Sequence, residues 1–159
     1  MSSVSRIPVI LDCDPGHDDA IAMMLACASP ELEILGVTSA AGNQTIEKTT
    51  LNARKLMTFL NLQVPIAAGA PGPLFRKLIV APEVHGSTGL DGPELPEPAV
   101  ELESCSAADL IARLVRASET AVTLVPTSAL TNIALFLTAY PELKDSIARI
   151  SLMGGGVNG

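Results

Sequence analysis

The sequence of 159 residues has no tryptophan, and its few aromatic residues are scattered along the chain: Phe59, Phe75, Phe136 and Tyr140. Proteins that bind single-stranded nucleic acids stack the bases on clustered aromatic side chains, so this function is not indicated. Basic residues are also scarce, because 10 Lys and Arg stand against 17 Asp and Glu and leave a net charge of −7. Nucleic acids and acidic membrane surfaces bind to basic patches, so neither is expected as a partner.

Cysteine is scarce as well, with three isolated residues, Cys13, Cys27 and Cys105, and no CxxC pair. An odd number of separate thiols does not predict a disulfide framework and indicates reduced cysteines. No apolar stretch reaches the length of a membrane span, and Met1 to Arg6 lack the apolar region of a signal peptide. We therefore expect a soluble, cytoplasmic protein.

Apolar residues are abundant, at 48% of the sequence against 17% for charged residues. Apolar runs and helical patterns alternate along the chain. The expected strands are residues 7–11, 32–39, 64–68, 122–125 and 148–153, and the expected helices are residues 18–28, 46–60, 107–118 and 130–139. This alternation predicts an α/β fold with a mostly parallel, Rossmann-like open sheet and helices on both faces. We expect one such domain over residues 1–159.

Residues 70–104 interrupt the alternation with six prolines and four glycines. An irregular segment of this length inside a compact domain is usually functional or disordered. Because it follows a strand of a parallel sheet, it is expected over the carboxyl edge of that sheet. We interpret it as a long active-site loop, with a disordered insert as the alternative.

Four carboxylates fall within eight positions directly after the first strand: Asp12, Asp14, Asp18 and Asp19. Like charges this close repel, and helix capping or a turn explains only two of them. The second pair opens a helix, where the helix dipole favours negative charge. Oxygen donors without Cys or His partners suit Ca²⁺ or Mg²⁺, so Asp14, Asp18 and Asp19 are expected to converge on a cation above the sheet.

Other strand exits carry polar residues or glycines, and ligands of parallel sheets bind beyond the carboxyl ends of the strands. Asn43 follows the second strand, as a site amide or as an ordinary turn residue. Thr127 follows the fourth strand and has two possible roles, a Ca²⁺ ligand or the N-cap of the next helix, and the sequence alone favours the cap. At the last exit, Gly154-Gly155-Gly156 lets a ligand approach the backbone.

The chain has two histidines. His17 stands among the aspartates, where it is expected to orient their side chains. His85 lies in the loop of residues 70–104, where a role at a nucleobase or in proton transfer stands beside the plainer interpretation of a surface residue.

The sequence resembles the calcium-dependent, inosine-uridine preferring nucleoside hydrolases, and five matching segments occur in the same order. They are DCDPGHDDA (12–20), VTSAAGNQT (37–45), VHGSTGLDG (84–92), LTNIA (130–134) and LMGGG (152–156). The histidine in the first segment is similar to that of the bacterial pyrimidine-specific members. Members of the family are about twice as long, so the resemblance implies the N-terminal portion of their fold, incomplete relative to the family.

The resemblance implies hydrolysis of the N-glycosidic bond of ribonucleosides, pyrimidine ones such as uridine and cytidine in particular, by a water bound to Ca²⁺. It implies Asp14 as catalytic base and Ca²⁺ ligand. It adds Asp19 and Thr127 as further Ca²⁺ ligands.

The resemblance also implies the residues that bind the small-molecule substrate. Asp18 accepts the ribose 2′-hydroxyl, and Asn43 and His85 contact the substrate, His85 near the nucleobase. Family members have a further metal-binding aspartate and a leaving-group histidine in their C-terminal half, which has no match here. We therefore expect a homo-oligomer or a part of a longer chain, with little hydrolysis by these residues alone.

Two alternatives remain open. A strand that ends Asp12-x-Asp14 resembles the nucleophile motif of haloacid-dehalogenase-type phosphohydrolases, although Pro15-Gly16 and the lack of a suitable lysine speak against it. The other alternative is an inactive Ca²⁺-binding fragment of the hydrolase fold. Release of phosphate, of free base, or of neither distinguishes the three hypotheses.

Overall fold

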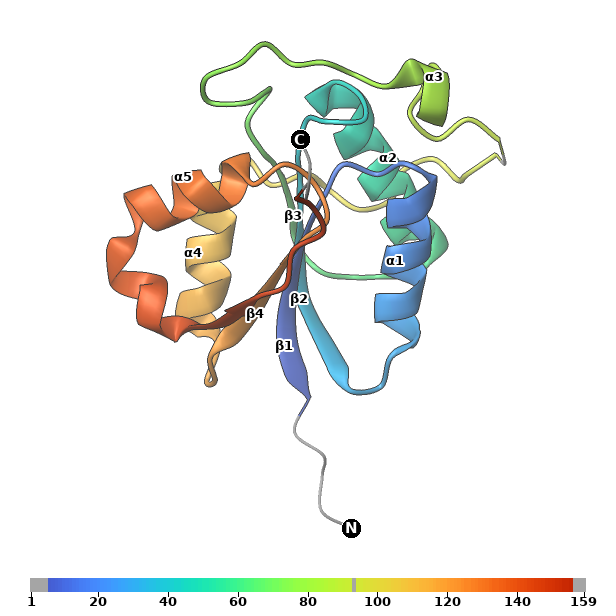
Figure 1. Cartoon of the computed structure of the whole chain (residues 1–159). Helices are drawn as coiled ribbons and strands as arrows, with labels where there is room; N and C mark the ends of the chain where they lie inside the picture. The colour runs from blue at the N-terminus through green and yellow to red at the C-terminus, as the bar shows by residue number, and fades with distance from the viewer. Residues whose placement is uncertain (1–5, 93, 156–159) are drawn as a thin grey trace.

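The computed structural model describes residues 6–92 and 94–155. Five strands form one sheet: β1 (Ile7–Cys13), β2 (Leu32–Ser39), β3 (Ile66–Ala68), β4 (Val122–Pro126) and β5 (Ile147–Ile150). Their order is β3-β2-β1-β4-β5, and every neighbouring pair is parallel. The sheet confirms the predicted α/β, Rossmann-like fold (Figure 1).

Helices cover both faces of the sheet (Figure 1). On one face lie α1 (His17–Ala28) and α2 (Ile46–Phe59), and on the other lie α4 (Ala107–Ala117) and α5 (Thr131–Ala139). Two short elements were not predicted, α3 (Pro82–His85) and the 3₁₀ helix η1 (Pro141–Ser146). Within the described ranges no helix has the length and apolar character needed to cross a membrane.

Alternation along β1 divides its side chains between two cores. Val9, Leu11 and Cys13 pack in the core under α1 and α2, whereas Ile10 packs in the core under α4 and α5. Because side chains of a strand alternate between its two faces, Asp12 shares the face of Ile10. The first aspartate of the cluster is therefore directed toward α5, away from α1.

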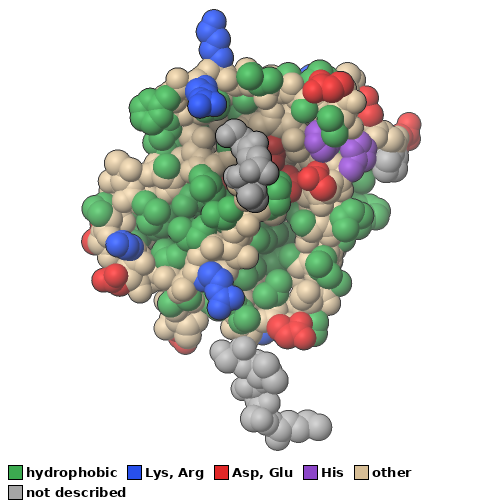
Figure 2. All heavy atoms as spheres, in the orientation of Figure 1, with side chains coloured by type: hydrophobic (Ala, Val, Ile, Leu, Met, Phe, Trp, Pro, Cys, Tyr) green, Lys and Arg blue, Asp and Glu red, His purple; other side chains and the backbone are tan. Residues whose placement is uncertain are grey.

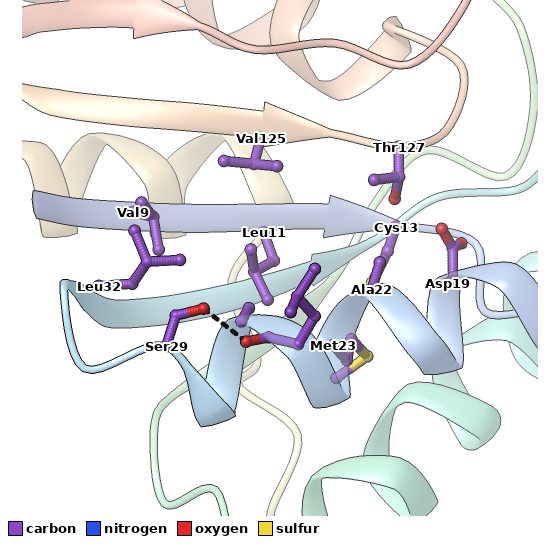
Figure 3. Close-up of a pocket in the computed structure, with 12 residues that line it drawn as sticks. Val9, Leu11, Cys13, Asp19, Ala22, Met23, Ser29, Leu32, Val125 and Thr127 are labelled. Atoms are coloured by element: carbon purple, nitrogen blue, oxygen red, sulfur yellow. Dashed lines mark hydrogen bonds between the residues drawn. The ribbon is translucent and has the colours of Figure 1, made fainter.

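The helix α1 carries apolar side chains on both of its faces. Met23 is buried against the sheet, while Ile21 and Leu25 are 63% and 68% exposed on the outside. A cavity of about 270 Å³ lies between α1 and the sheet, and Figure 3 shows its apolar lining with Asp19 and Thr127 at one end. A helix that is apolar on all sides is typical of a protein interior. The outer face of α1 is therefore more apolar than an ordinary solvent-facing surface.

The strands β1 and β4 extend past their predicted ends to Cys13 and Pro126, whereas two strands are shorter than predicted, and in both of these a proline accounts for it. The strand β3 begins at Ile66 instead of residue 64, because Pro65 has no N–H for the ladder. The strand β5 spans Ile147–Ile150 instead of residues 148–153. Beyond it the chain still donates from Met153 N to Pro126 O (3.0 Å), but Pro126 has no N–H to return. Of the glycine-rich exit, residues 156–158 lie outside the described residues.

Residues 70–104 run over the carboxyl edge of the sheet and include α3 (Figure 1). Ala81 N donates to Asn43 O (3.0 Å), so the loop lies beside the exit of β2. Further on, Leu102 pairs with Ile66 in an isolated parallel bridge. The loop thus leaves the sheet at β3 and returns to the same strand.

Candidate active site

The strand order reverses between β1 and β4, since the chain proceeds from β1 to β2 and β3 on one side and from β4 to β5 on the other. In open parallel sheets such a reversal leaves a crevice beyond the carboxyl ends of the two strands. Asp12 pairs in register with Pro126, and Thr127 N donates to Asp12 O (2.9 Å). The exits of β1 and β4, with their predicted site residues, therefore meet at this crevice.

Asp12 forms the buried base of the site, with 1% of its surface exposed. Its Oδ1 accepts hydrogen bonds from Thr38 Oγ1 (2.6 Å) and Asn132 Nδ2 (2.8 Å). Its Oδ2 is buried and has no hydrogen-bond partner among the described residues. Burial raises the pKa of Asp12 to about 6, against the opposing effect of the two hydrogen bonds. The carboxylate thus joins β1 to β2 and α5, and one of its oxygens remains free for a further partner.

Asn132 was not predicted as a site residue, although it ties several elements together. Besides the bond to Asp12, its side-chain amide donates to Ser39 O (2.9 Å) and accepts from Ala70 N (3.0 Å), where the long loop begins. A sequence signal exists, because Asn132 shares the buried face of α5 with Ile133 and Phe136. A polar residue on an apolar helix face needs buried partners.

Asp14 and Asp19 form a close pair. Asp14 N donates to Asp19 Oδ2 (3.0 Å), and Asn43 donates from its backbone to Asp14 Oδ2 (2.6 Å) and from its side chain to Asp14 O (3.1 Å). Burial raises the pKa of Asp14 to about 7, and the charge of Asp19 adds to the rise. Burial likewise raises the pKa of Asp19. Two adjacent carboxyl groups whose pKa values are both raised by burial favour a nearby cation.

Gly42 makes this arrangement possible. A Cβ atom at Gly42 would lie 2.1 Å from Asp14 Oδ2, which is closer than any side chain permits. The missing side chain therefore lets the turn after β2 approach the carboxylate.

The prediction that Thr127 caps the next helix is wrong. The helix α5 begins at Thr131 with Leu130 at its N-cap position, because Ser128 and Ala129 add further residues between the strand and the helix. Thr127 Oγ1 instead lies 3.4 Å from Asp12 O and donates to it. A hydrogen bond of the Thr127 side chain also opposes the rise in the pKa of Asp19. Thr127 is thus oriented toward the aspartates.

A cavity of about 430 Å³ with polar and apolar lining opens at the crevice, and we call it the polar cavity because two aspartates line it. Its lining includes Asp14, Asp18, Asn43 and Thr127, together with Met153 and Gly154 of the last strand exit. Four of the six predicted site residues therefore share one cavity. Asp19 lines the neighbouring apolar cavity, and His85 lines neither.

The two histidines lie side by side next to acidic side chains (Figure 2). Their rings are stacked, with centroids 6.0 Å apart and an interplanar angle of 17°. His17 was expected to orient the aspartate side chains, but its Nε2 bonds to the backbone oxygen of Asp91 (2.8 Å). A Cβ at Gly16 would lie 2.4 Å from His85 Nδ1, so the His85 ring rests on the backbone of the aspartate segment.

The donor set fits a hard cation in part. Among the described residues no three His, Cys, Asp or Glu side chains form a complete metal-binding group. What the site offers is the carboxylate pair of Asp14 and Asp19 beside Thr127, with the free oxygen of Asp12 near β1's exit. All are oxygen donors, as Ca²⁺ prefers, but Ca²⁺ takes about six to eight of them. Water or further residues must complete such a set.

Comparison with known proteins shows the family of the chain. A family model described as inosine-uridine preferring nucleoside hydrolase matches residues 9–159. The chain is 55% identical over 152 residues to the pyrimidine-specific ribonucleoside hydrolase RihA of Escherichia coli O127:H6 and 55% identical to RihA of Klebsiella pneumoniae. Each alignment covers 95% of this chain and 49% of the relative, so the chain spans about half the length of the curated relatives it matches.

Among solved structures, the fold is similar to that of a purine-preferring ribonucleoside hydrolase from Gardnerella vaginalis. The TM-score is 0.87 at 34% identity, with 94% of this chain and 49% of the other covered.

Proposed function

Because the chain belongs to the inosine-uridine preferring nucleoside hydrolase family, we propose that it serves the hydrolysis of the N-glycosidic bond of ribonucleosides. The single observation that carries the proposal is the buried Asp14–Asp19 pair, of which Asp14 lines the polar cavity where the strand order reverses. Relatives with 55% identity are named pyrimidine-specific, whereas the 34% identical structure is named purine-preferring. This difference in identity supports uridine and cytidine as substrates. Family membership also favours the glycosidase over the phosphohydrolase hypothesis.

Asp14 is proposed as the base that takes a proton from the attacking water. A general base works best when its pKa lies near the working pH, and burial brings that of Asp14 to about 7. The two hydrogen bonds from Asn43 hold Asp14 in place. Since the transition state of glycoside hydrolysis resembles an oxocarbenium ion, the nearby carboxylates also stabilise the positive charge on the ribose.

Asp18 is proposed to bind the ribose. It is exposed and lines the same cavity as Asp14, so its carboxylate can accept a hydrogen bond from the 2′-hydroxyl. A ribonucleoside can donate this hydrogen bond, whereas a deoxyribonucleoside has no 2′-hydroxyl to donate it. This difference predicts a preference for ribose.

Asp14, Asp19 and Thr127 are the residues proposed to hold Ca²⁺. When bound, the cation orients a water molecule and lowers its pKa. Thermal or urea denaturation with chelator and with added Ca²⁺ tests this. Saturation at about 100 times the dissociation constant should stabilise the fold by about 2.7 kcal/mol. Asp14→Asn should remove this response, while Asp145→Asn, which lies in η1 far along the chain, should keep it. A wild-type chain that does not respond to Ca²⁺ contradicts the metal proposal.

The experiment for the function itself is uracil release from uridine, followed by chromatography with and without Ca²⁺. Within the described residues no histidine lines the polar cavity, so the departing base lacks an evident acid and we expect a low rate. Asp14→Asn should lower the rate by a further factor of about 10² to 10⁴. Phosphate release from phosphomonoesters would support the phosphohydrolase hypothesis. Neither cleavage nor binding of uridine would leave the Ca²⁺-binding fragment as the function.

The cellular compartment of the protein and its association with other chains are proposed on two observations. The three cysteines are unpaired, which supports a reducing compartment such as the cytoplasm. The exposed apolar side chains of α1 support association with a second copy or with the remainder of a longer chain. Light scattering of the 159-residue chain measures association with a second copy.

A further inference from the structure

We propose that His17 is a positioning residue: it anchors the turn of residues 86–91 and supports the ring of His85 against the aspartate segment. The inference rests on the proposed function, because placing His85 matters for catalysis only if the polar cavity receives a nucleoside. Three side chains at α2 hold the other side of the same turn.

The turn of residues 86–91 is built around one carboxylate. The side chain of Asp91 accepts hydrogen bonds from Ser87 N (3.0 Å), from Thr88 N (2.9 Å) and from the Thr88 hydroxyl. Gly86 and Gly89 have φ angles of 81° and 87°, a region that disfavours other residues. The turn therefore has a defined shape of its own, and its position depends on what holds it from outside.

The segment that leads into α2 and one face of α2 hold the turn by its backbone. Gln44 Nε2 donates to Gly86 O (3.1 Å), Lys48 Nζ donates to Ser87 O (2.6 Å) and Asn52 Nδ2 donates to Thr88 O (3.0 Å). Lys48 and Asn52 are four residues apart on α2 and therefore share one face of the helix, whereas Gln44 lies two residues before the helix begins. Three successive carbonyl groups of the turn thus meet three successive donors.

His17 holds the turn from the side of α1. Its Nε2 lies 2.8 Å from Asp91 O, and because a carbonyl oxygen only accepts, this nitrogen carries the hydrogen. The same imidazole stacks on the ring of His85. On its other side His85 approaches Gly16, where an added Cβ would lie 2.4 Å from Nδ1. The His85 ring is therefore confined between His17 and the backbone of the aspartate segment.

His17 contributes two separable interactions, the donor to Asp91 and the stacked ring. His17→Gln keeps a side-chain donor and removes the ring, His17→Phe keeps a ring and removes the donor, and His17→Ala removes both. A residue that merely occupies the first turn of α1 would give the same result in all three variants. If His17 is a positioning residue, loss of the donor affects the turn, whereas loss of the ring affects His85.

The two histidines of the chain make the measurement direct. With histidine labelled at ¹³Cε1, every His17 variant leaves a single resonance, that of His85. We expect His17→Phe to keep this resonance near its wild-type position, and His17→Ala and His17→Gln to shift it. Amide exchange at Ser87 and Thr88 should accelerate about fivefold in the Ala and Phe variants, as expected for one lost hydrogen bond, and less in the Gln variant.

Matched lysine variants at α2 control for general loosening of the fold. Lys48→Met should accelerate exchange at Ser87 and Thr88 like His17→Ala, because it removes a donor to the turn. Lys55→Met should not, since Lys55 pairs with Glu97 (3.2 Å) outside the turn. If His17→Ala fails to fold, the Gln and Phe variants still separate donor from ring.

Unchanged exchange at Ser87 and Thr88 together with an unchanged His85 resonance in the His17 variants would overturn the proposal. Titration with uridine adds the functional readout, with binding weakened about fivefold in His17→Ala and less in His17→Gln. If no variant, nor the wild-type chain, binds uridine, the proposed function fails, while the exchange data still decide the role of His17.

Discussion

The aspartate segment after β1 and the loop after β3 reach the same edge of the sheet but are stabilised in opposite ways. Asp12, Asp14 and Asp19 are at most 6% exposed, and β2 and α5 bond to Asp12 through Thr38 and Asn132. In the loop, Phe75 and Ile79 are 96% and 86% exposed, and its best-held part, the turn of residues 86–91, is bound by side chains of α1 and α2. The core thus places the charges of the site, whereas a few hydrogen bonds place the loop, two from the exposed His17 and Lys48 and two from the buried Gln44 and Asn52. The two regions should respond differently to substitution.

The largest effect on the site is expected in the buried region, from Asn132→Ala. It removes the hydrogen bonds to Asp12, Ser39 and Ala70 and leaves a buried carboxylate less satisfied. Unfolding in urea should show a loss of about 3 kcal/mol, the range for buried groups bonded to a charge. The matched change Asn43→Ala, at a half-buried position, should cost less. Equal costs at the two asparagines would mean that burial does not distinguish the two regions.

Gly42→Ala tests how tightly the aspartate segment is packed. Its Cβ would lie 2.1 Å from Asp14 Oδ2, so we expect a loss of about 1–3 kcal/mol in unfolding free energy and a weaker response to Ca²⁺. Gly72→Ala in the loop is the control, because its nearest atom, Leu78 Cβ, is 3.6 Å away. It should change stability by no more than about 0.5 kcal/mol. An unchanged unfolding free energy in Gly42→Ala would show that Asp14 is free to move.

Acid should loosen the turn of residues 86–91, which depends on an ionised carboxylate. Hydrogen bonds from Thr88 and then Ser87 lower the pKa of Asp91 to about 2. A carboxyl group with a lowered pKa stabilises the folded form above its unfolded pKa, and this contribution is lost as the pH falls toward the folded value. Protection of the Ser87 and Thr88 amides from exchange should therefore hold at pH 5 and decline between about pH 4 and pH 2. In Asp91→Asn the protection of these amides should be weak at every pH. Protection in the wild-type chain that does not change with pH would contradict the prediction.

The smallest effect is expected at the exposed part of the loop. Phe75→Ala should change the unfolding free energy by less than about 0.5 kcal/mol, because the side chain has little packing to lose. Phe136→Ala, at a fully buried phenylalanine, should cost about 3–5 kcal/mol in the same measurement. A cost above 1 kcal/mol at Phe75 would mean that this part of the loop packs against the protein after all.

The same contrast explains what could be predicted from the sequence. The strand β2 occupies residues 32–39 as predicted, because its apolar run is a local pattern. The aspartates and Thr127 could be assigned to one edge, because parallel strands bring their exits together. The short α3 and η1 were missed, since four to six residues carry too little periodicity to show a helix.

The contacts that complete the site could not be predicted, because they join residues distant in the chain. The partners of Lys48 and Asn52 lie more than thirty positions away, in a turn whose place no local pattern indicates. The N-cap expectation for Thr127 failed for a related reason. A threonine before a helix suggests a cap, but the helix starts four residues later and the tertiary partner is Asp12.

The central position of β1 has a consequence for how the protein folds. One neighbour of β1, β2, follows directly, but the other arrives only when Val9 meets Thr123, more than a hundred positions later. During synthesis β1 therefore remains an open edge for most of the chain, and such late, non-local pairing slows folding. Asp12 and Asp14 stand at the end of this edge, where charges discourage pairing with the wrong strand. Asp14, which is proposed as the catalytic base of the finished fold, would then protect the chain from aggregation together with Asp12 while it is still being made.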